Sequence, residues 1–215
     1  MILGIETSGQ LCSIAWYADE QILLEYNVER RNVHATILAD LFQMGMNFLN
    51  INNADISLAV IGVGPGSYTG LRIGMSFLKG LCYGADIPVV GISNFKVLAL
   101  QACSEKTSLI TLINANKGKY YYATFKDKYS DFSDKGIAEI SKISKFTKSY
   151  TGVVLESSLE VENDKNPWNN FSWITHGNFR ASYFCKAAFE KFNKFGPENL
   201  NELEPMYLQA FAGIL

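Results

Sequence analysis

Residues 64–74 read Gly-Pro-Gly-Ser-Tyr-Thr-Gly-Leu-Arg-Ile-Gly, and they connect an apolar segment, 58–63, to a helix-like segment, 70–85. This order predicts a strand, a glycine-rich turn and a helix, which is the repeating unit of α/β proteins. Gly64 and Gly66 allow backbone angles that other residues avoid. The stretch therefore indicates an α/β fold in which this turn lies at the end of a buried strand.

The same turn predicts an anion-binding geometry. Ser67 or Thr69 can cap the following helix by accepting its free N–H groups. The remaining backbone donors then lie at the positive end of the helix dipole, where a phosphate or a carboxylate can bind. The spacing matches neither the P-loop nor the dinucleotide fingerprint, so the residues alone indicate an anion-competent turn and no more.

The rest of the chain predicts a run of strands and helices, followed by a second unit that starts near residue 108. Apolar or alternating segments predict strands at 2–7, 11–18, 21–28, 58–63, 87–92, 109–114 and 119–125, with weaker strands at 136–141, 151–155 and 172–176. Helical patterns cover 33–49, 70–85, about 94–103 and 180–194. We therefore expect two lobes, residues 1–105 and a smaller, divergent lobe at 106–215.

Composition favours a globular protein. The 215 residues are 48% hydrophobic and carry a net charge of −2, which argues against a strong stand-alone nucleic-acid binder. The four cysteines are far apart and form no CxxC pair, so reduced thiols are favoured over a disulfide framework. No signal-peptide pattern or membrane-spanning run is visible, and we expect a cytoplasmic protein without membrane partners.

Two further places can carry chemistry. Glu6, Thr7 and Ser8 end the first predicted strand, where ligands gather in open sheets, but the two hydroxyls can equally satisfy a local turn. His34 opens the first helix, yet Leu38 occupies the position four residues later, where a second histidine ligand would lie. We therefore predict no metal site.

The first two helices are unusually apolar or rich in glycine. The helix at 33–49 carries a broad apolar stripe, and the helix at 70–85 contains glycines at positions 70, 74, 80 and 84. Each glycine costs about 1 kcal/mol of helix stability relative to alanine, so close packing must compensate. Either both helices only cover the sheet, or they also present a self-associating surface to a partner.

Together these residues resemble the TsaB (YeaZ) family, a relative of the Gcp/TsaD family in the actin-like ATPase superfamily. The resemblance rests on Ile2–Ser8, His34, the stretch at 64–74, the segment Ile87–Ser93 and the terminal Leu203–Leu208. It is dense over residues 1–102 and thin beyond them. It implies an actin-like (RNase H-like) fold with two lobes, each a mixed sheet flanked by helices.

The resemblance also implies a function. The chain looks like the non-catalytic dimerisation subunit that supports a TsaD-type enzyme in threonylcarbamoyl transfer to the adenosine beside the tRNA anticodon. A TsaE-type ATPase is the expected third partner, and tRNA is met through the complex. A homodimer is the alternative when the partner is absent. An independent actin-like phosphotransferase is the competing hypothesis, and a peptidase has little support.

The resemblance places the partner interface on the first two helices. The expected interface residues are His34, Ile37, Leu38, Leu41, Phe42, Gly45, Gly70, Leu71, Gly74, Met75 and Leu78. We expect no catalytic residue and no firmly bound cofactor in this chain, and any nucleotide lies at the subunit boundary. The residues of that nucleotide or phosphate loop are Glu6, Thr7, Ser8, Gly64, Gly66, Ser67 and Thr69.

Overall fold

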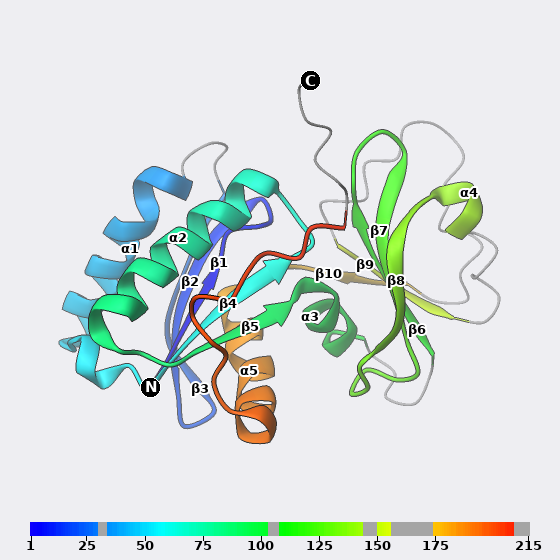
Figure 1. Cartoon of the computed structure of the whole chain (residues 1–215). Coiled ribbons are helices and arrows are strands. Elements are labelled where there is room, and N and C mark those ends of the chain that lie inside the picture. The colour runs from blue at the N-terminus through cyan, green and yellow to red at the C-terminus, as the bar shows by residue number, and fades with distance from the viewer. Residues whose placement is uncertain (30–33, 103–107, 144–149, 156–173, 209–215) are drawn as a thin grey trace. The chain divides into compact units, whose positions relative to one another are not determined.

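The computed structural model describes residues 1–29, 34–102, 108–143, 150–155 and 174–208, and within them it contains two five-stranded sheets (Figure 1). The chain divides into two units. The first consists of residues 1–94 and 179–205, and the second of residues 95–178 and 206–215.

The first unit is built on a mixed sheet with the strand order β3-β2-β1-β4-β5. Its strands are β1 (Ile2–Glu6), β2 (Leu11–Ala18), β3 (Gln21–Glu29), β4 (Leu58–Gly64) and β5 (Val89–Ser93). Its helices are α1 (His34–Leu49), α2 (Tyr68–Ala85) and α5 (Ala181–Phe195), with a short 3-10 helix at Asn53–Asp55. Strands β1, β2 and β3 are antiparallel neighbours, whereas β1, β4 and β5 run parallel.

The helices cover both faces of this sheet because the side chains of a strand alternate between its faces. Leu3 and Ile5 on β1 belong to the core that α1 and α2 close. Gly4, between them, faces α5, because a Cβ at Gly4 would overlap Cys185 Sγ and lie 2.8 Å from the carbonyl oxygen of Ala181. The central strands are therefore buried on both faces, as their continuous apolar sequences predict.

The segment after α5 lies along the free edge of this sheet. The backbone N–H of Glu198 donates to the carbonyl of Val89 at 2.9 Å, and Lys191 binds both Glu198 and the carbonyl of Gly91. Leu203 is 5% exposed and joins the core. The segment thus covers an edge strand that would otherwise expose unpaired backbone groups.

The second unit repeats the strand pattern of the first, with the order β10-β9-β6-β7-β8. Its strands are β6 (Leu109–Asn114), β7 (Lys119–Phe125), β8 (Phe132–Glu139), β9 (Thr151–Leu155) and β10 (Ile174–Gly177). Its helices are α3 (Asn94–Leu100), which begins at the last residue of segment 1–94, and α4 (Ile140–Ile143). The first three strands are antiparallel and the last two add in parallel, as in the first unit.

Most predicted elements are confirmed, and the differences have local causes. Helix α2 begins at Tyr68, two residues earlier than expected, because Ser67 is the residue that caps it. Strand β8 begins at Phe132 and not at 136, and the one-turn helix α4 was not predicted. Helix α3 ends at Leu100, before the expected end near residue 103, since residues 101 and 102 already leave the helix. The predicted starts at residues 33 and 172 lie outside the described residues.

The division into units differs from the expected boundary at residue 105. Helix α5 belongs to the first unit, where it packs against β1, β2, β4 and β5. Its N-terminal turn is fixed there, because the N–H of Ala181 donates to Ser13 Oγ at 2.8 Å and that of Ser182 to Glu25 Oε1 at 2.9 Å. Strand periodicity cannot reveal which sheet a distant helix covers.

The cysteines and the hydropathy of the helices were the subject of two expectations. Cys12, Cys82 and Cys185 are buried free thiols, and Cys103 lies outside the described residues. None of the helices in the described part of the chain combines the length and the hydropathy that a membrane span needs.

Candidate functional site

Two loops of the first unit are joined by hydrogen bonds at the carboxyl ends of β1 and β4. The N–H of Ser67 donates to the carbonyl of Ser8 at 2.8 Å, and the hydroxyl of Thr7 donates to the carbonyl of Gly70 at 2.7 Å. Ser67 Oγ in turn accepts the N–H of Gly70 at 3.2 Å, which caps α2. The turn after β1 thus holds the start of α2.

We call this hydrogen-bonded contact between the turn after β1 and the loop that starts α2 the joint. The side chain of Glu6 stabilises it. Its carboxyl is fully buried, and Oε1 accepts hydrogen bonds from the N–H of Ser8 at 2.5 Å, from the N–H of Gly9 at 3.2 Å and from the Ser8 hydroxyl. Oε2 has no hydrogen-bond partner among the described residues. Burial raises the pKa of Glu6 from 4.5 to about 7, and the bonds from Ser8 and Gly9 oppose the rise.

Asn94 connects both loops and was missed as a site residue by the sequence. Its Oδ1 accepts the N–H of Gly64 at 3.1 Å, while its Nδ2 donates to Ser8 Oγ at 2.5 Å and to the carbonyl of Pro65 at 3.1 Å. The sequence predicts only that a helix begins near Asn94. Its role follows from its complete burial beside the end of a strand, which the structure shows and no local sequence pattern indicates.

Three glycines let α2 and its loop approach the first turn. A Cβ at Gly70 would overlap the carbonyl oxygen of Thr7, and one at Gly74 would overlap Thr7 Oγ1. A Cβ at Gly66 would lie 2.7 Å from both Cβ and the carbonyl oxygen of Ser8. A side chain would thus meet the backbone of the first turn at Gly66 and Gly70 and the Thr7 side chain at Gly74, so the close approach alone explains the three glycines.

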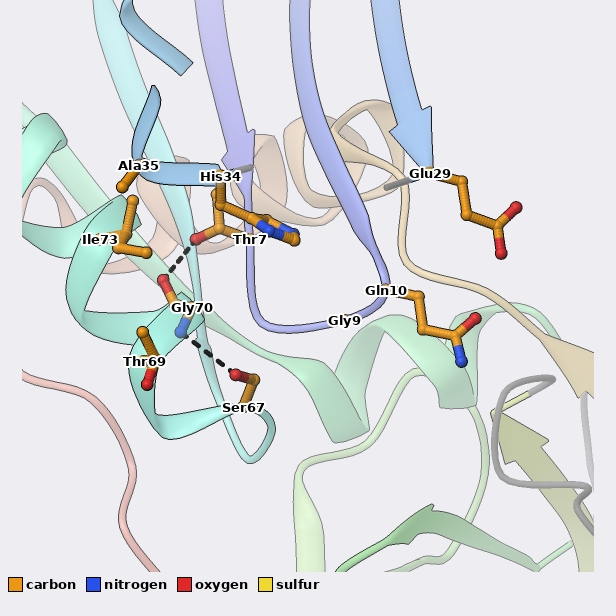
Figure 2. Close-up of a pocket in the computed structure, with 10 residues that line it drawn as sticks. All are labelled: Thr7, Gly9, Gln10, Glu29, His34, Ala35, Ser67, Thr69, Gly70 and Ile73. Carbon is orange, nitrogen blue, oxygen red and sulfur yellow. Dashed lines mark hydrogen bonds between the residues drawn. The ribbon is translucent and has the colours of Figure 1, made fainter. Parts of the chain in front are cut away.

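A cavity of about 580 Å³ opens beside this joint (Figure 2). Its lining comes from the turn after β1, the end of β3 and the first turns of α1 and α2. The lining residues are Thr7, Gly9, Gln10, Glu29, His34, Ala35, Ser67, Thr69, Gly70 and Ile73. The cavity is therefore polar on the side of the two loops and apolar where α1 and α2 meet.

Of the seven predicted nucleotide-loop residues, Thr7, Ser67 and Thr69 line the cavity. The other four are not among the lining residues named above, and Glu6 and Ser8 are buried. The backbone donors of residues 8, 9, 64, 67 and 70 already bind protein acceptors. A ligand in this cavity would therefore meet side-chain hydroxyls and the remaining donors of the α2 start.

The described residues contain no group of three or more His, Cys, Asp or Glu side chains that could hold a metal ion. His34 lies at the cavity, and its Nε2 is buried without a hydrogen-bond partner among those residues. Leu38, one turn later, is 1% exposed and belongs to the core. The second ligand position is thus filled by a packing residue.

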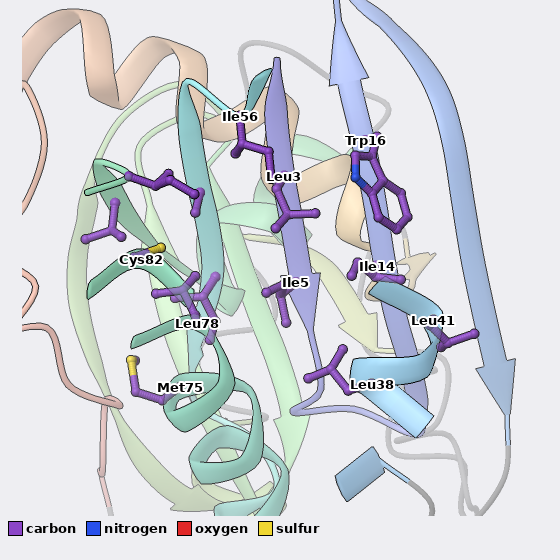
Figure 3. Close-up of a cluster of buried hydrophobic side chains, with 14 of the residues drawn as sticks. Leu3, Ile5, Ile14, Trp16, Leu38, Leu41, Ile56, Met75, Leu78 and Cys82 are labelled. Carbon is purple, nitrogen blue, oxygen red and sulfur yellow. The ribbon is translucent and has the colours of Figure 1, made fainter. Parts of the chain in front are cut away.

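The predicted interface residues mostly face inward (Figure 3). Those buried inside the first unit are Leu38, Leu41, Gly45, Gly70, Leu71, Gly74, Met75 and Leu78. Gly45, for example, lies against Trp16, where a Cβ would overlap the indole ring. Only His34, Ile37 and Phe42 from the predicted set are half-exposed. The apolar stripe read from the sequence is therefore the core-facing side of the two helices.

A different set of residues forms the outer face of α1 and α2. Ser76, Gly80 and Gly84 follow one another at intervals of four residues on α2 and are exposed, and a Cβ at either glycine would meet no atom within 4 Å. A groove of about 350 Å³ runs between the helices, lined by Ala35, Leu38, Ala39, Arg72, Ile73, Ser76 and Phe77. We call the exposed residues of this group the outer helical face, and they are Ala35, Ala39, Arg72, Ser76, Gly80 and Gly84.

Large apolar side chains stand exposed on the same two helices. Phe48 on α1 is 72% exposed and Met44 is 55% exposed, while Tyr83 on α2 is 82% exposed. Phe42 and Phe77 join the helices beneath them, with ring centroids 5.6 Å apart. Exposed apolar groups beside small residues are typical of surfaces that meet a partner.

The architecture defines the class of protein. Both units have the same strand order, with three antiparallel strands followed by two parallel ones, and this is an α/β protein with the actin-like (RNase H-like) fold. YeaZ from Pseudomonas aeruginosa has the same fold, with a TM-score of 0.77 and 16% sequence identity over 96% of this chain and 99% of that one.

Sequence relatives identify the family. The family model described as TsaD, tRNA N6-adenosine threonylcarbamoyltransferase, matches residues 29–194. The Haemophilus influenzae protein named tRNA threonylcarbamoyladenosine biosynthesis protein TsaB is 30% identical over 97% of this chain and 93% of its own length. The chain belongs to the TsaB (YeaZ) family.

The part of each relative that aligns with this chain differs from one relative to another. The Escherichia coli TsaB protein is also 30% identical, over 58% of this chain, and the alignment spans 54% of that protein. The Bacillus subtilis TsaB protein is 28% identical, and the alignment spans 56% of it. The chain thus covers about half the length of these two relatives.

Proposed function

We infer that this chain acts in the biosynthesis of threonylcarbamoyladenosine in tRNA, as a non-catalytic subunit that binds and supports a TsaD-type enzyme. Family membership supports the pathway, because the relatives are named for it. The single observation that supports the scaffold role is the outer helical face, since the same two helices also expose the large apolar side chains of Phe48 and Tyr83.

The outer helical face has the features that helix–helix association needs. Ser76, Gly80 and Gly84 let a second helix approach the α2 backbone closely, as small residues do in tightly packed helix pairs. Phe48 and Tyr83 offer apolar area that a partner would remove from water. A glycine in an exposed helix lowers helix stability, so two of them are best explained by a contact outside this chain.

Gel filtration of the chain mixed with its cognate TsaD-type subunit tests this function. We expect a 1:1 mixture to elute earlier than either protein alone. Ser76→Arg, which places a long charged side chain in the groove, should abolish the shift. Glu190→Arg, at an exposed position of α5, is the matched control and should retain it. Separate elution of the wild-type proteins would overturn the proposal.

Other assignments follow from the same scaffold role. We expect no transferase activity and no firmly bound cofactor in the isolated chain, tRNA contacts made through the complex, and a TsaE-type ATPase as third partner. A nucleotide at the subunit boundary would bind beside Thr69, where the cavity opens. Calorimetry with ATP and magnesium tests this, because micromolar binding by the isolated chain would favour an independent phosphotransferase instead.

A further inference from the structure

The two carboxyl oxygens of Glu6 have different surroundings. Oε1 accepts bonds from Ser8 and Gly9, whereas Oε2 is buried without a partner among the described residues. A Cβ at Gly62 would overlap Oε2 and would lie 3.0 Å from Asn94 Oδ1 and 2.9 Å from a ring carbon of Phe184. Oε2 therefore shares its surroundings with another acceptor and an aromatic ring.

This environment favours the protonated carboxyl. A proton on Oε2 removes the charge that burial disfavours, and it supplies a donor beside the Asn94 carbonyl oxygen. An ionised Oε2 would instead be a buried negative charge without a hydrogen-bond donor among the described residues. The amide of Asn94 can relieve this only by turning its Nδ2 toward Oε2, which would release Ser8 Oγ and the carbonyl of Pro65.

Few other titratable groups act on Glu6. In the part of the chain that the structure describes, Glu6 interacts electrostatically with the thiol of Cys12 on β2, whose pKa is raised to about 11 by burial and by Glu6. The atoms nearest to a Cβ at Gly62, besides Oε2, belong to Phe184 of α5 and to Asn94, and both side chains are uncharged. The Cys12 thiol is neutral at physiological pH, so the carboxyl is the group that changes charge near neutrality.

We propose that Glu6 is a proton-controlled joint between the turn after β1 and the loop that starts α2. In its protonated form the joint is closed, with Asn94 bound to both loops. When Glu6 loses its proton, Asn94 exchanges its partners, and the connection that its Nδ2 makes between Ser8 Oγ and the carbonyl of Pro65 is lost. The joint belongs to this chain alone, so its test needs no partner protein.

NMR titration of the wild-type chain between pH 5 and pH 9 tests this proposal. We expect the Glu6 carboxyl carbon to titrate near pH 7. The amide signals of Ser8, Gly9, Gly64 and Ser67 and the side-chain amide of Asn94 should shift with the same midpoint. A carboxyl carbon that titrates near pH 4.5, or amide signals that do not follow it, would overturn the proposal.

Two variants separate the joint from a general effect of pH. Glu6→Gln keeps the size of the side chain and offers a permanent donor at the Oε2 position, so the same amides should stay constant over this pH range. Glu29→Gln removes an exposed carboxylate at the neighbouring cavity and should titrate like the wild type. If Glu6→Gln titrates like the wild type, the joint does not exist. Should Glu6→Gln fail to fold, the wild-type titration still decides.

Discussion

The two halves of helix α2 use the same residue type for opposite purposes. In the first half, Gly70 lies against the backbone of Thr7 and Gly74 against its side chain, and a Cβ at either position would overlap an atom of Thr7. In the second half, a Cβ at Gly80 or Gly84 would meet no atom within 4 Å. The packing of this chain explains the inner glycines, and we propose that a partner covers the outer ones.

This contrast assigns separate tasks to one helix. Its first half belongs to a joint held by Glu6, Ser8 and Asn94 inside the first unit. Its second half belongs to the outer helical face that we propose for the partner. Changes in the first half should therefore alter stability, and changes in the second half should alter association.

The largest change in the free energy of unfolding is expected from a change in pH. The pKa of Glu6 rises from 4.5 to about 7 on folding, so the unfolded chain releases this proton first as the pH increases. The free energy of unfolding should therefore be highest below pH 4.5 and fall by about 3 kcal/mol by pH 7 through this group. Urea unfolding at several pH values measures it, and Glu6→Gln should lack this part of the dependence. Identical pH profiles for both proteins would refute the assignment.

Adding one methyl group in the first half of α2 should also destabilise the fold. Gly74→Ala places a Cβ against Thr7 Oγ1 and 3.3 Å from Ile61 Cδ1, so the helix must move away from β1 and β4. We expect a loss of about 2 kcal/mol in the free energy of unfolding, within the range known for overpacked cores. Urea unfolding checks it, and unchanged stability would mean that the close contact is not needed.

Removing the helix cap should have a smaller effect. Ser67→Ala leaves the N–H of Gly70 without its side-chain acceptor. We expect a loss of about 1 kcal/mol, as for other caps, seen as a lower thermal midpoint. Thr69→Ala, two residues later, is the control, because the side chain that caps α2 is that of Ser67. An equal loss of stability in both variants would contradict the assignment of the cap to Ser67.

The smallest effect should have the opposite sign. Gly80→Ala adds a methyl group that meets no other atom, so only the helix propensity changes. We expect a gain of about 1 kcal/mol at most. Denaturant unfolding of Gly80→Ala and Gly74→Ala measures the effect of the same substitution at two positions of one helix. If both variants lose stability, the contrast between the halves of α2 is wrong.

Local sequence patterns predicted most strands and helices, whereas the burial of each helix face depends on the tertiary structure. The turn at Asn116–Gly118 joins the predicted strands β6 and β7 and has positive φ at all three residues. The stripe that contains Leu38, Leu41 and Met75 was assigned to the partner, and that assignment stays a prediction. Apolar periodicity identifies the side of a helix that is buried, and here the sheet buries it.

The site was predictable only in part for a related reason. The pattern around Ser67 indicates a cap and an anion-competent turn, because both depend on neighbouring residues. The hydrogen bonds of Ser8 and Asn94 join segments far apart in the sequence, and no local pattern predicts them. These contacts occupy backbone N–H donors that we had expected to bind a phosphate.

Binding of the Gly80→Arg variant tests the central claim that the outer half of α2 meets a partner. Titration calorimetry with the cognate TsaD-type subunit gives its affinity, and a thermal scan of the same sample gives its stability. We predict an affinity at least about 100-fold lower than that of the wild type, since a charged side chain would block close approach, with an unchanged or higher thermal midpoint. Wild-type affinity in a folded Gly80→Arg protein would contradict the account.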